Sequence, residues 1–185
     1  LLHVLQVVPD LGAGAAGAHH AQPGRVGPGA GGGEHLHHVA AAQLGAVLAG
    51  QPPDKEQAMA RYGIHLGTAF QLIDDVLDYS ASSVELGKNI GDDLAEGKPT
   101  LPLIYALRQG MPDEVRIIRE AITHGGLEQI EVVTRAIEST GALDYTYRLA
   151  IEEADRAVAH LAVLQDSPAK DALIDLARFA VSRHY

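Results

Sequence analysis

The chain has 185 residues, a formal net charge of −10 and no cysteine. The acidic balance excludes an electrostatic case for nucleic-acid binding. The lack of cysteine excludes disulfides and zinc–thiolate sites and is typical of a cytoplasmic protein. No apolar run approaches the ~18–20 residues of a membrane-spanning helix, and the N-terminus lacks the basic residues of a signal peptide.

Residues 1–39 differ in composition from the rest of the chain, and most of positions 12–33 are Gly, Ala, Pro or His. Such a segment buries too little apolar surface to offset the entropy lost on ordering, so we expect it to be disordered. Because the same bias arises when a GC-rich gene is read out of frame, a frame-shifted segment is the alternative interpretation. In either case the folded part is expected to span residues 40–185.

From residue 40 onward, apolar residues recur at helical spacing, and no alternating β pattern stands out. The expected fold class is therefore all-α. The sequence predicts helices over Ala40–Ala49, Pro53–Tyr79, Leu101–Leu107, Pro112–Thr123, Leu127–Ser139, Leu143–Leu164 and Pro168–His184. Ser167 is expected to cap the last of these helices, with a proline at its first position.

Two of these helices carry patterns that predict buried and exposed faces. In the helix over 53–79, an apolar stripe and a histidine are predicted to serve core packing rather than ligand binding or catalysis; they are Met59, Tyr62, Leu66, Phe70 and His65. In the helix over 143–164, the charged residues are predicted to be exposed; they are Glu152, Glu153, Asp155 and Arg156.

Three acids stand near the end of the helix over 53–79. Gln71, Asp74, Asp75 and Asp78 follow the spacing i, i+3, i+4 and i+7, so they share one helical face. Like charges at this spacing repel, and a cation would relieve the repulsion. Mg²⁺ suits such a face because it takes one or two carboxylates and completes its shell with water and phosphate oxygens. The sequence therefore predicts a magnesium site.

A glycine-containing loop is expected to follow, and it carries Lys88, Asp92 and Lys98. Lysine binds phosphate as a hydrated point charge on a flexible stem, and glycines let the backbone bend toward a ligand. Asp92 could hold a lysine or a metal-bound water. A DDxxD sequence alone is more often a solvated acidic face. The joint pattern, FQxxDDxxD followed by GKxxxxDxxxGKxT, favours a site for a magnesium diphosphate.

This joint pattern resembles the second aspartate-rich region of the trans-type polyprenyl diphosphate synthases, in particular the bacterial octaprenyl type. The resemblance covers about Ala40–Tyr185 and corresponds to the C-terminal part, about half, of a typical member. It implies a helical bundle of the isoprenoid synthase type that is incomplete at its N-terminal side, and a homodimer in the complete member. It also implies condensation of isopentenyl diphosphate with an allylic diphosphate to a long-chain polyprenyl diphosphate.

The resemblance implies roles for individual residues. The magnesium ligands on the allylic diphosphate would be Asp74, Asp75 and Asp78. The catalytic set would comprise Asp74, Asp75, Lys88 and Lys98. The substrate-binding set would comprise Phe70, Gln71, Lys88, Asp92 and Lys98, with Phe70 lining the isopentenyl pocket or the core.

The sequence departs from the family in two respects, because it contains no first aspartate-rich motif and none of the early helices. We therefore predict that this chain alone has no useful turnover, and that apolar faces meant to meet those helices are exposed. An alternative is a non-catalytic partner subunit of a complete synthase. A terpene cyclase would not need the lysine-containing loop, and a purely structural bundle would leave the clustered acids unexplained.

Overall fold

The computed structural model describes residues 34–80, 91–124 and 127–182, and the structural statements below concern these residues. Their regular elements are all helices, which confirms the expected all-α class. In chain order they are α2 (Glu34–Leu48), α3 (Pro53–Asp78), α5 (Asp92–Ala95), α6 (Leu101–Gln109), α7 (Pro112–His124), the 3₁₀ turn η3 (Leu127–Gln129), α8 (Ile130–Ser139), α9 (Ala142–His160), the 3₁₀ turn η4 (Leu161–Val163) and α10 (Pro168–Val181).

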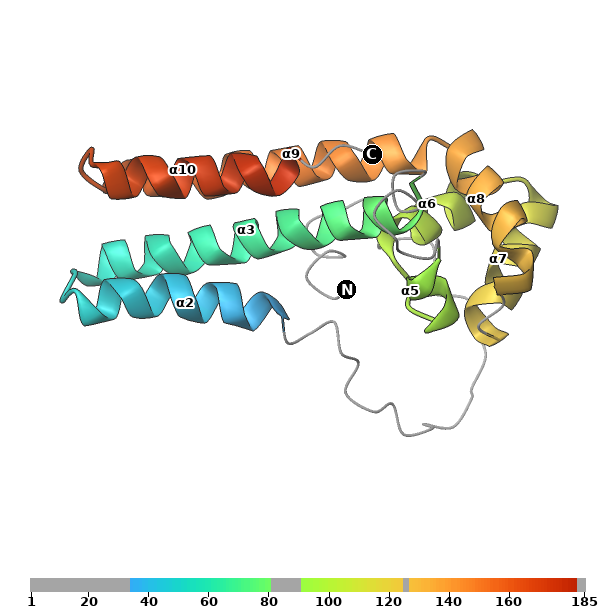
Figure 1. The fold of residues 1–185 in the computed structure, drawn as a ribbon, viewed down its shortest axis with the longest axis horizontal. Coiled ribbons are helices and arrows are strands. Elements are labelled where there is room, and N and C mark those ends of the chain that lie inside the picture. The colour runs from blue at the N-terminus through green and yellow to red at the C-terminus, as the bar shows by residue number, and fades with distance from the viewer. Residues whose placement is uncertain (1–33, 81–90, 125–126, 183–185) are drawn as a thin grey trace.

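Helix α3 is the central element of the molecule (Figure 1). It packs along α9 on one side and along α2 on the other, while α10 folds back beside α9. The shorter helices α5 to α8 gather at the end of α3 where Asp78 lies. Prolines at positions 52 and 53 start α3 because they supply the helical φ and lack the N–H that would have no partner there.

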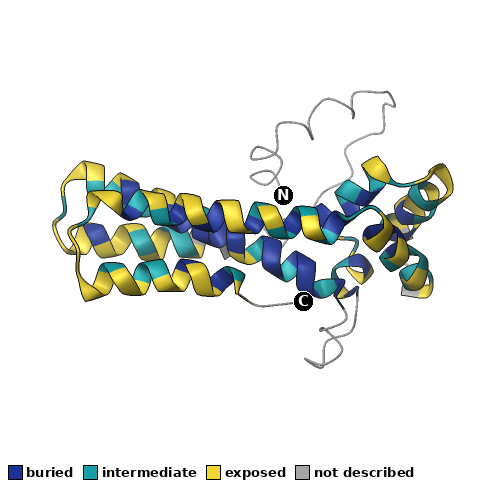
Figure 2. Cartoon of the chain, turned by 90° about the horizontal axis from the view of Figure 1, so that it is seen from above, coloured by how far each residue is buried: buried dark blue, intermediate teal, exposed yellow. Residues whose placement is uncertain are grey.

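Three apolar clusters hold this arrangement together. The first joins α2, α3, α9 and α10 around Tyr62 and Leu161, and the second joins α3, α6 and α9 around Ile73. The third fills the space among α5 to α8, with Leu94 and neighbouring side chains fully buried. Burial of each such large side chain stabilises the fold by about 1.5–3 kcal/mol. Because residues of α3 or its C-cap take part in all three clusters, this stabilisation holds α3 in place along its length. Figure 2 shows the buried faces meeting between the long helices.

Helix boundaries agree with the sequence predictions except at a few places. Helix α2 begins at Glu34 rather than Ala40, so the expected boundary at residue 39 falls inside a helix. Close packing explains the extension, because a Cβ at Gly63 of α3 would lie 2.6 Å from the carbonyl oxygen of His38. The long helix expected over 143–164 ends at His160 and continues as the turn η4. Ser167 caps α10 as expected, since its Oγ accepts a hydrogen bond from the Lys170 N–H at 3.2 Å.

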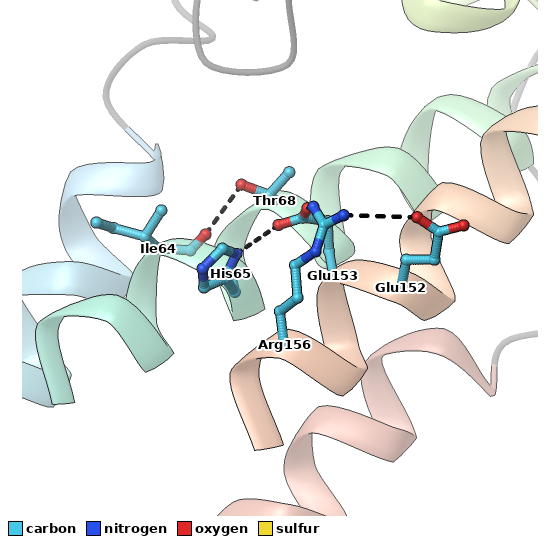
Figure 3. Close-up of polar contacts among 6 residues, drawn as sticks. All are labelled: Ile64, His65, Thr68, Glu152, Glu153 and Arg156. Atoms are coloured by element: carbon cyan, nitrogen blue, oxygen red, sulfur yellow. Dashed lines mark hydrogen bonds and ion pairs between the residues drawn. The ribbon is translucent and has the colours of Figure 1, made fainter. Parts of the chain in front are cut away.

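The prediction that Glu153 is exposed is wrong. Its side chain is completely buried between α9 and α3, where His65 Nδ1 lies 2.6 Å from Glu153 Oε2 (Figure 3). Arg156 also pairs with Glu153, and its second nitrogen lies 3.6 Å from Glu152 Oε2. Burial alone would raise the pKa of Glu153, but the hydrogen bonds and charges of His65 and Arg156 outweigh it and hold that pKa below its usual value. The packing role predicted for His65 agrees with this contact.

Phe70 also departs from the predicted apolar stripe. Tyr62 and Leu66 are buried as expected, whereas Phe70 remains 36% exposed, with its ring centroid 5.9 Å from that of His38. The disorder expected of residues 1–39 is wrong for residues 34–39, which belong to helix α2, and residues 1–33 lie outside the described residues. In the part of the chain that the structure describes, no helix has the length and apolar character needed to cross a bilayer.

Candidate functional site

The acids singled out in the sequence occupy the last two turns of α3. Apolar neighbours on the same turns, including Ile73 and Val76, are fully buried, and this fixes the direction in which the acids project. Asp75 is the most buried of the three acids at 9% exposed, while Asp74 and Asp78 are partly buried. The acidic face therefore lies within the fold rather than on a solvated surface.

The short helix α5 faces this end of α3, although the sequence predicted a loop here. Gly91 precedes it with φ of 84°, a left-handed conformation that glycine adopts without steric cost. Asp92 and Asp93 occupy the first turn, where the helix dipole favours negative charge, and Leu94 anchors the helix in the core. The backbone N–H of Asp93 donates to Asp78 Oδ2 at 3.3 Å, which joins α5 to α3.

Lys98 lies between the acids of the two helices. Its Nζ is 3.0 Å from Asp93 Oδ1 and 3.8 Å from Asp75 Oδ1. Burial lowers the pKa of Lys98, but the hydrogen bond to Asp93 and the charge of Asp75 outweigh this effect, so the pKa is raised. The side chain is still 43% exposed, so the ammonium group is accessible from solvent.

Asp75 also contacts the start of α6. The backbone N–H of Leu101 donates to Asp75 Oδ2 at 3.4 Å. Burial raises the pKa of Asp75 to about 7, although the Lys98 ammonium opposes the shift. Burial and the neighbouring Asp93 charge raise the pKa of Asp78 to about 6. Ionisation of Asp75 and Asp78 is therefore less favourable in this environment than in water.

This imbalance of charge fits a divalent cation. Five carboxylates lie near a single described ammonium group, that of Lys98, at this end of α3. The acids are Asp74, Asp75, Asp78, Asp92 and Asp93. Hard oxygen donors are the ligands that Mg²⁺ prefers, so the donor chemistry matches. Within the described ranges, no three such groups converge closely enough to hold an ion, and Asp75 and Asp78 instead accept backbone N–H bonds.

The structure brings together most, but not all, of the predicted site residues. Gln71 lies partly buried one turn before the acids, and Phe70 lies beside it. Lys88 lies outside the described residues. Asp92 is exposed, and the lysine contact expected of it is made by Asp93.

Sequence reasoning missed two partners in this site, the Asp93 side chain and the Leu101 backbone N–H. The adjacent Asp92–Asp93 pair after a glycine was a usable signal for the first, because acids prefer the first turn of a helix. The second left no signal, since every residue except proline supplies a backbone N–H.

Comparison with known proteins establishes the family. The model of the polyprenyl synthetase family matches residues 36–140, which is more than half of the chain. The chain therefore belongs to the polyprenyl synthetase family.

Individual relatives agree with this membership. The chain is 52% identical over 145 residues to octaprenyl diphosphate synthase of Escherichia coli K12, a match that covers 78% of this chain and 45% of that protein. A polyprenyl synthase of Caulobacter crescentus, solved with calcium and isoprenyl diphosphate, superposes with a TM-score of 0.72 and 43% identity, covering 79% of this chain and 45% of that one. Geranylgeranyl pyrophosphate synthase of Corynebacterium glutamicum, solved with isoprenyl diphosphate and magnesium, superposes with a TM-score of 0.67 and 32% identity. This match covers 76% of this chain and 41% of that one. The chain thus spans about half the length of these relatives.

Proposed function

We propose that this chain supplies the diphosphate-binding half of a prenyltransferase site that condenses isopentenyl diphosphate with an allylic diphosphate. The position of Lys98 between Asp75 and Asp93, beside the acidic face of α3, carries the proposal. A cation and a lysine together are what an enzyme needs to stabilise a departing diphosphate. Solved relatives bound to isoprenyl diphosphate and calcium or magnesium support the assignment.

The acids on α3 would hold the metal. Asp74, Asp75 and Asp78 are the proposed ligands of Mg²⁺, which when bound would neutralise charge on the diphosphate. Because Asp75 and Asp78 are costly to ionise in the fold described here, a cation would favour their charged forms. The backbone hydrogen bonds to Asp75 and Asp78 use only their Oδ2 atoms, so Oδ1 of each would remain available to Mg²⁺.

The remaining residues would bind substrate. Lys98 would contact diphosphate oxygens directly, and its exposed ammonium group is accessible to them. Lys88 is proposed for the same role, with Asp92 supporting the segment between the lysines. Gln71 would steady the acids, and Phe70, being partly exposed, would line the isopentenyl pocket.

The reaction requires more than this half. The diphosphate leaves as an allylic cation forms, the isopentenyl double bond attacks that cation, and a proton is then lost. We propose a long-chain polyprenyl diphosphate as the product, a homodimer as the complete assembly, and the cytoplasm as the location. Because the chain spans 45% of the Escherichia coli relative, we expect no turnover from the 185-residue chain alone.

The test is calorimetric titration of the purified chain with farnesyl diphosphate in the presence and absence of Mg²⁺. Asp74→Ala should lower the magnesium-dependent affinity by about tenfold or more, equivalent to roughly 1.4 kcal/mol. Asp155→Ala, on an exposed position of α9, serves as the matched control and should leave affinity unchanged. Equal affinity of the Asp74→Ala variant and the unmodified chain would refute the metal assignment.

A further inference from the structure

Tyr79 and Thr100 carry hydroxyl groups that find no partner among the described residues. Both residues are only 2% exposed, and neither Tyr79 Oη nor Thr100 Oγ1 makes a hydrogen bond within the described part of the chain. A hydroxyl in the interior has given up its hydrogen bonds to bulk water, so native proteins rarely leave one without a replacement. Each of these two groups therefore calls for a polar partner.

The two hydroxyls lie close together where α3 meets α6. Tyr79 is the C-cap of α3, and Thr100 is the N-cap of α6, which packs against that end of α3 (Figure 1). Burial and the charge of Asp78 raise the pKa of Tyr79, while Thr100 is near enough to the Tyr79 hydroxyl to oppose them. One polar species placed between the two side chains would therefore satisfy both.

Thr100 has the position of an N-cap residue but does not make its usual bond. A threonine here commonly accepts a hydrogen bond from an N–H in the first turn of the helix, whereas the Thr100 side chain makes none. The N–H of Leu101 donates instead to Asp75 Oδ2 at 3.4 Å, and Pro102 has no N–H. The Thr100 hydroxyl is thus left for a partner outside α6.

Packing of the Tyr79 ring fixes the direction of its hydroxyl. The ring belongs to the apolar cluster of α5 to α8, together with the fully buried Leu94 and Leu103. Tyr79 follows Asp75 by four residues, so both lie on the side of α3 that meets the first turn of α6. Asp75 holds that turn by a hydrogen bond, and Tyr79 lies beside the same turn without one.

A single water molecule suits this place. The two oxygen atoms are buried, so a group as large as a diphosphate cannot reach them, whereas a buried water needs only two to four polar partners. Each hydroxyl can donate to water or accept from it. We propose that Tyr79 and Thr100 are positioning residues that hold one buried water between them, and that this water fixes the first turn of α6 against Asp75. The consequence for metal binding rests on the proposed function, whereas the contact itself does not.

The test uses the purified chain without metal or diphosphate, so failure of the proposed function would leave its readouts unchanged. Hydrogen exchange followed by NMR measures the protection of the Leu101 amide, which donates to Asp75. Tyr79→Phe and Thr100→Val each remove one partner of the water. Each should speed exchange of this amide by about threefold or more, the size expected for loss of one hydrogen bond, and should lower the urea midpoint. Thr100→Ser keeps a hydroxyl and should retain the protection.

Tyr62→Phe is the matched control. Tyr62 is similarly buried, and its hydroxyl donates to the carbonyl oxygen of Leu173 at 2.8 Å, in the cluster around Leu161 rather than at α6. This variant should also lower the urea midpoint, because it removes a buried hydrogen bond. It should leave exchange at Leu101 unchanged relative to exchange at Ala154, a buried residue of α9.

A crystal structure of the chain supplies the direct observation, and we expect a water within about 3.2 Å of both hydroxyl oxygens. The proposal is overturned if the two hydroxyls bond directly to each other with no water between them. It is also overturned if Tyr79→Phe raises the urea midpoint, as removal of an unpaired buried hydroxyl would. Exchange at Leu101 that changes no more in Tyr79→Phe than in Tyr62→Phe would overturn the positioning role.

Discussion

Asp75 of α3 caps the first turn of α6, because its Oδ2 accepts the backbone N–H of Leu101 at 3.4 Å. The N-cap residue Thr100 makes no such side-chain bond, so Asp75 takes over that role from another helix. The helix dipole of α6 favours the charged carboxylate, but burial outweighs it and raises the pKa of Asp75 to about 7. One carboxylate thus fixes α6 and also belongs to the proposed metal site.

This double role predicts how Asp75→Asn affects stability. The folded pKa of about 7 lies above the usual 3.8, so the favourable neutral form is fully present only at low pH and is lost as the pH rises through about 7. Asn stays neutral and keeps an acceptor for Leu101. Between about pH 4 and pH 8, the unfolding free energy of the unmodified chain should fall relative to that of the variant by on the order of 3 kcal/mol.

Urea unfolding at several pH values measures this difference. Asp75→Ala is the control, because it removes the charge and the acceptor together and should be less stable than Asp75→Asn by about 1–3 kcal/mol at every pH. A difference between the unmodified chain and Asp75→Asn that does not change with pH would contradict the raised pKa.

Lys98→Gln separates ligand binding from folding. Lys98 is 43% exposed, so loss of its ion pairs with Asp93 and Asp75 should cost less than about 1 kcal/mol of stability. Affinity for inorganic diphosphate with Mg²⁺ should fall by about tenfold, because a positive charge facing the ligand is removed. Lys55→Gln, at the other end of α3, is the control in the same titration, and an equal loss in both variants would argue against a specific role for Lys98.

Glu153→Gln tests the buried polar contact between α3 and α9. The pKa of Glu153 is held below its usual value, so its stabilisation is present above about pH 4.5 and is lost as the pH falls through the folded pKa. The variant should be less stable by about 2 kcal/mol near pH 7, because two charge-assisted hydrogen bonds are weakened. The difference should shrink as the pH falls below about 4.5 and through the lowered pKa of Glu153. Glu152→Gln, on a 57% exposed neighbour, should change stability little in the same unfolding series.

The sequence predicted the elements better than it predicted contacts between them. Periodicity and proline positions located α3 and α10 to within a few residues, because those signals are local. The sequence analysis predicted that Glu153 is exposed to solvent, because a run of charged residues on an amphipathic helix does not indicate a contact with His65, 88 positions away. For the site, helical spacing gathered the acids of α3, whereas the approach of Asp93 and Leu101 depends on how the chain returns through α5 and α6.

Helices α2 and α3 approach each other closely at Gly63. A Cβ at Gly63 would lie 2.6 Å from His38 O and 2.8 Å from Val39 Cα, and backbone atoms cannot move aside as a side chain can. Gly63→Ala should therefore destabilise the chain by about 1–3 kcal/mol. Gly45→Ala is the control, because nothing lies within 4 Å of its Cβ position and alanine favours a helix interior by up to about 1 kcal/mol. Thermal unfolding followed by circular dichroism should lower the midpoint for Gly63→Ala and raise it for Gly45→Ala. Equal midpoints would mean that α2 does not pack on α3 at Gly63.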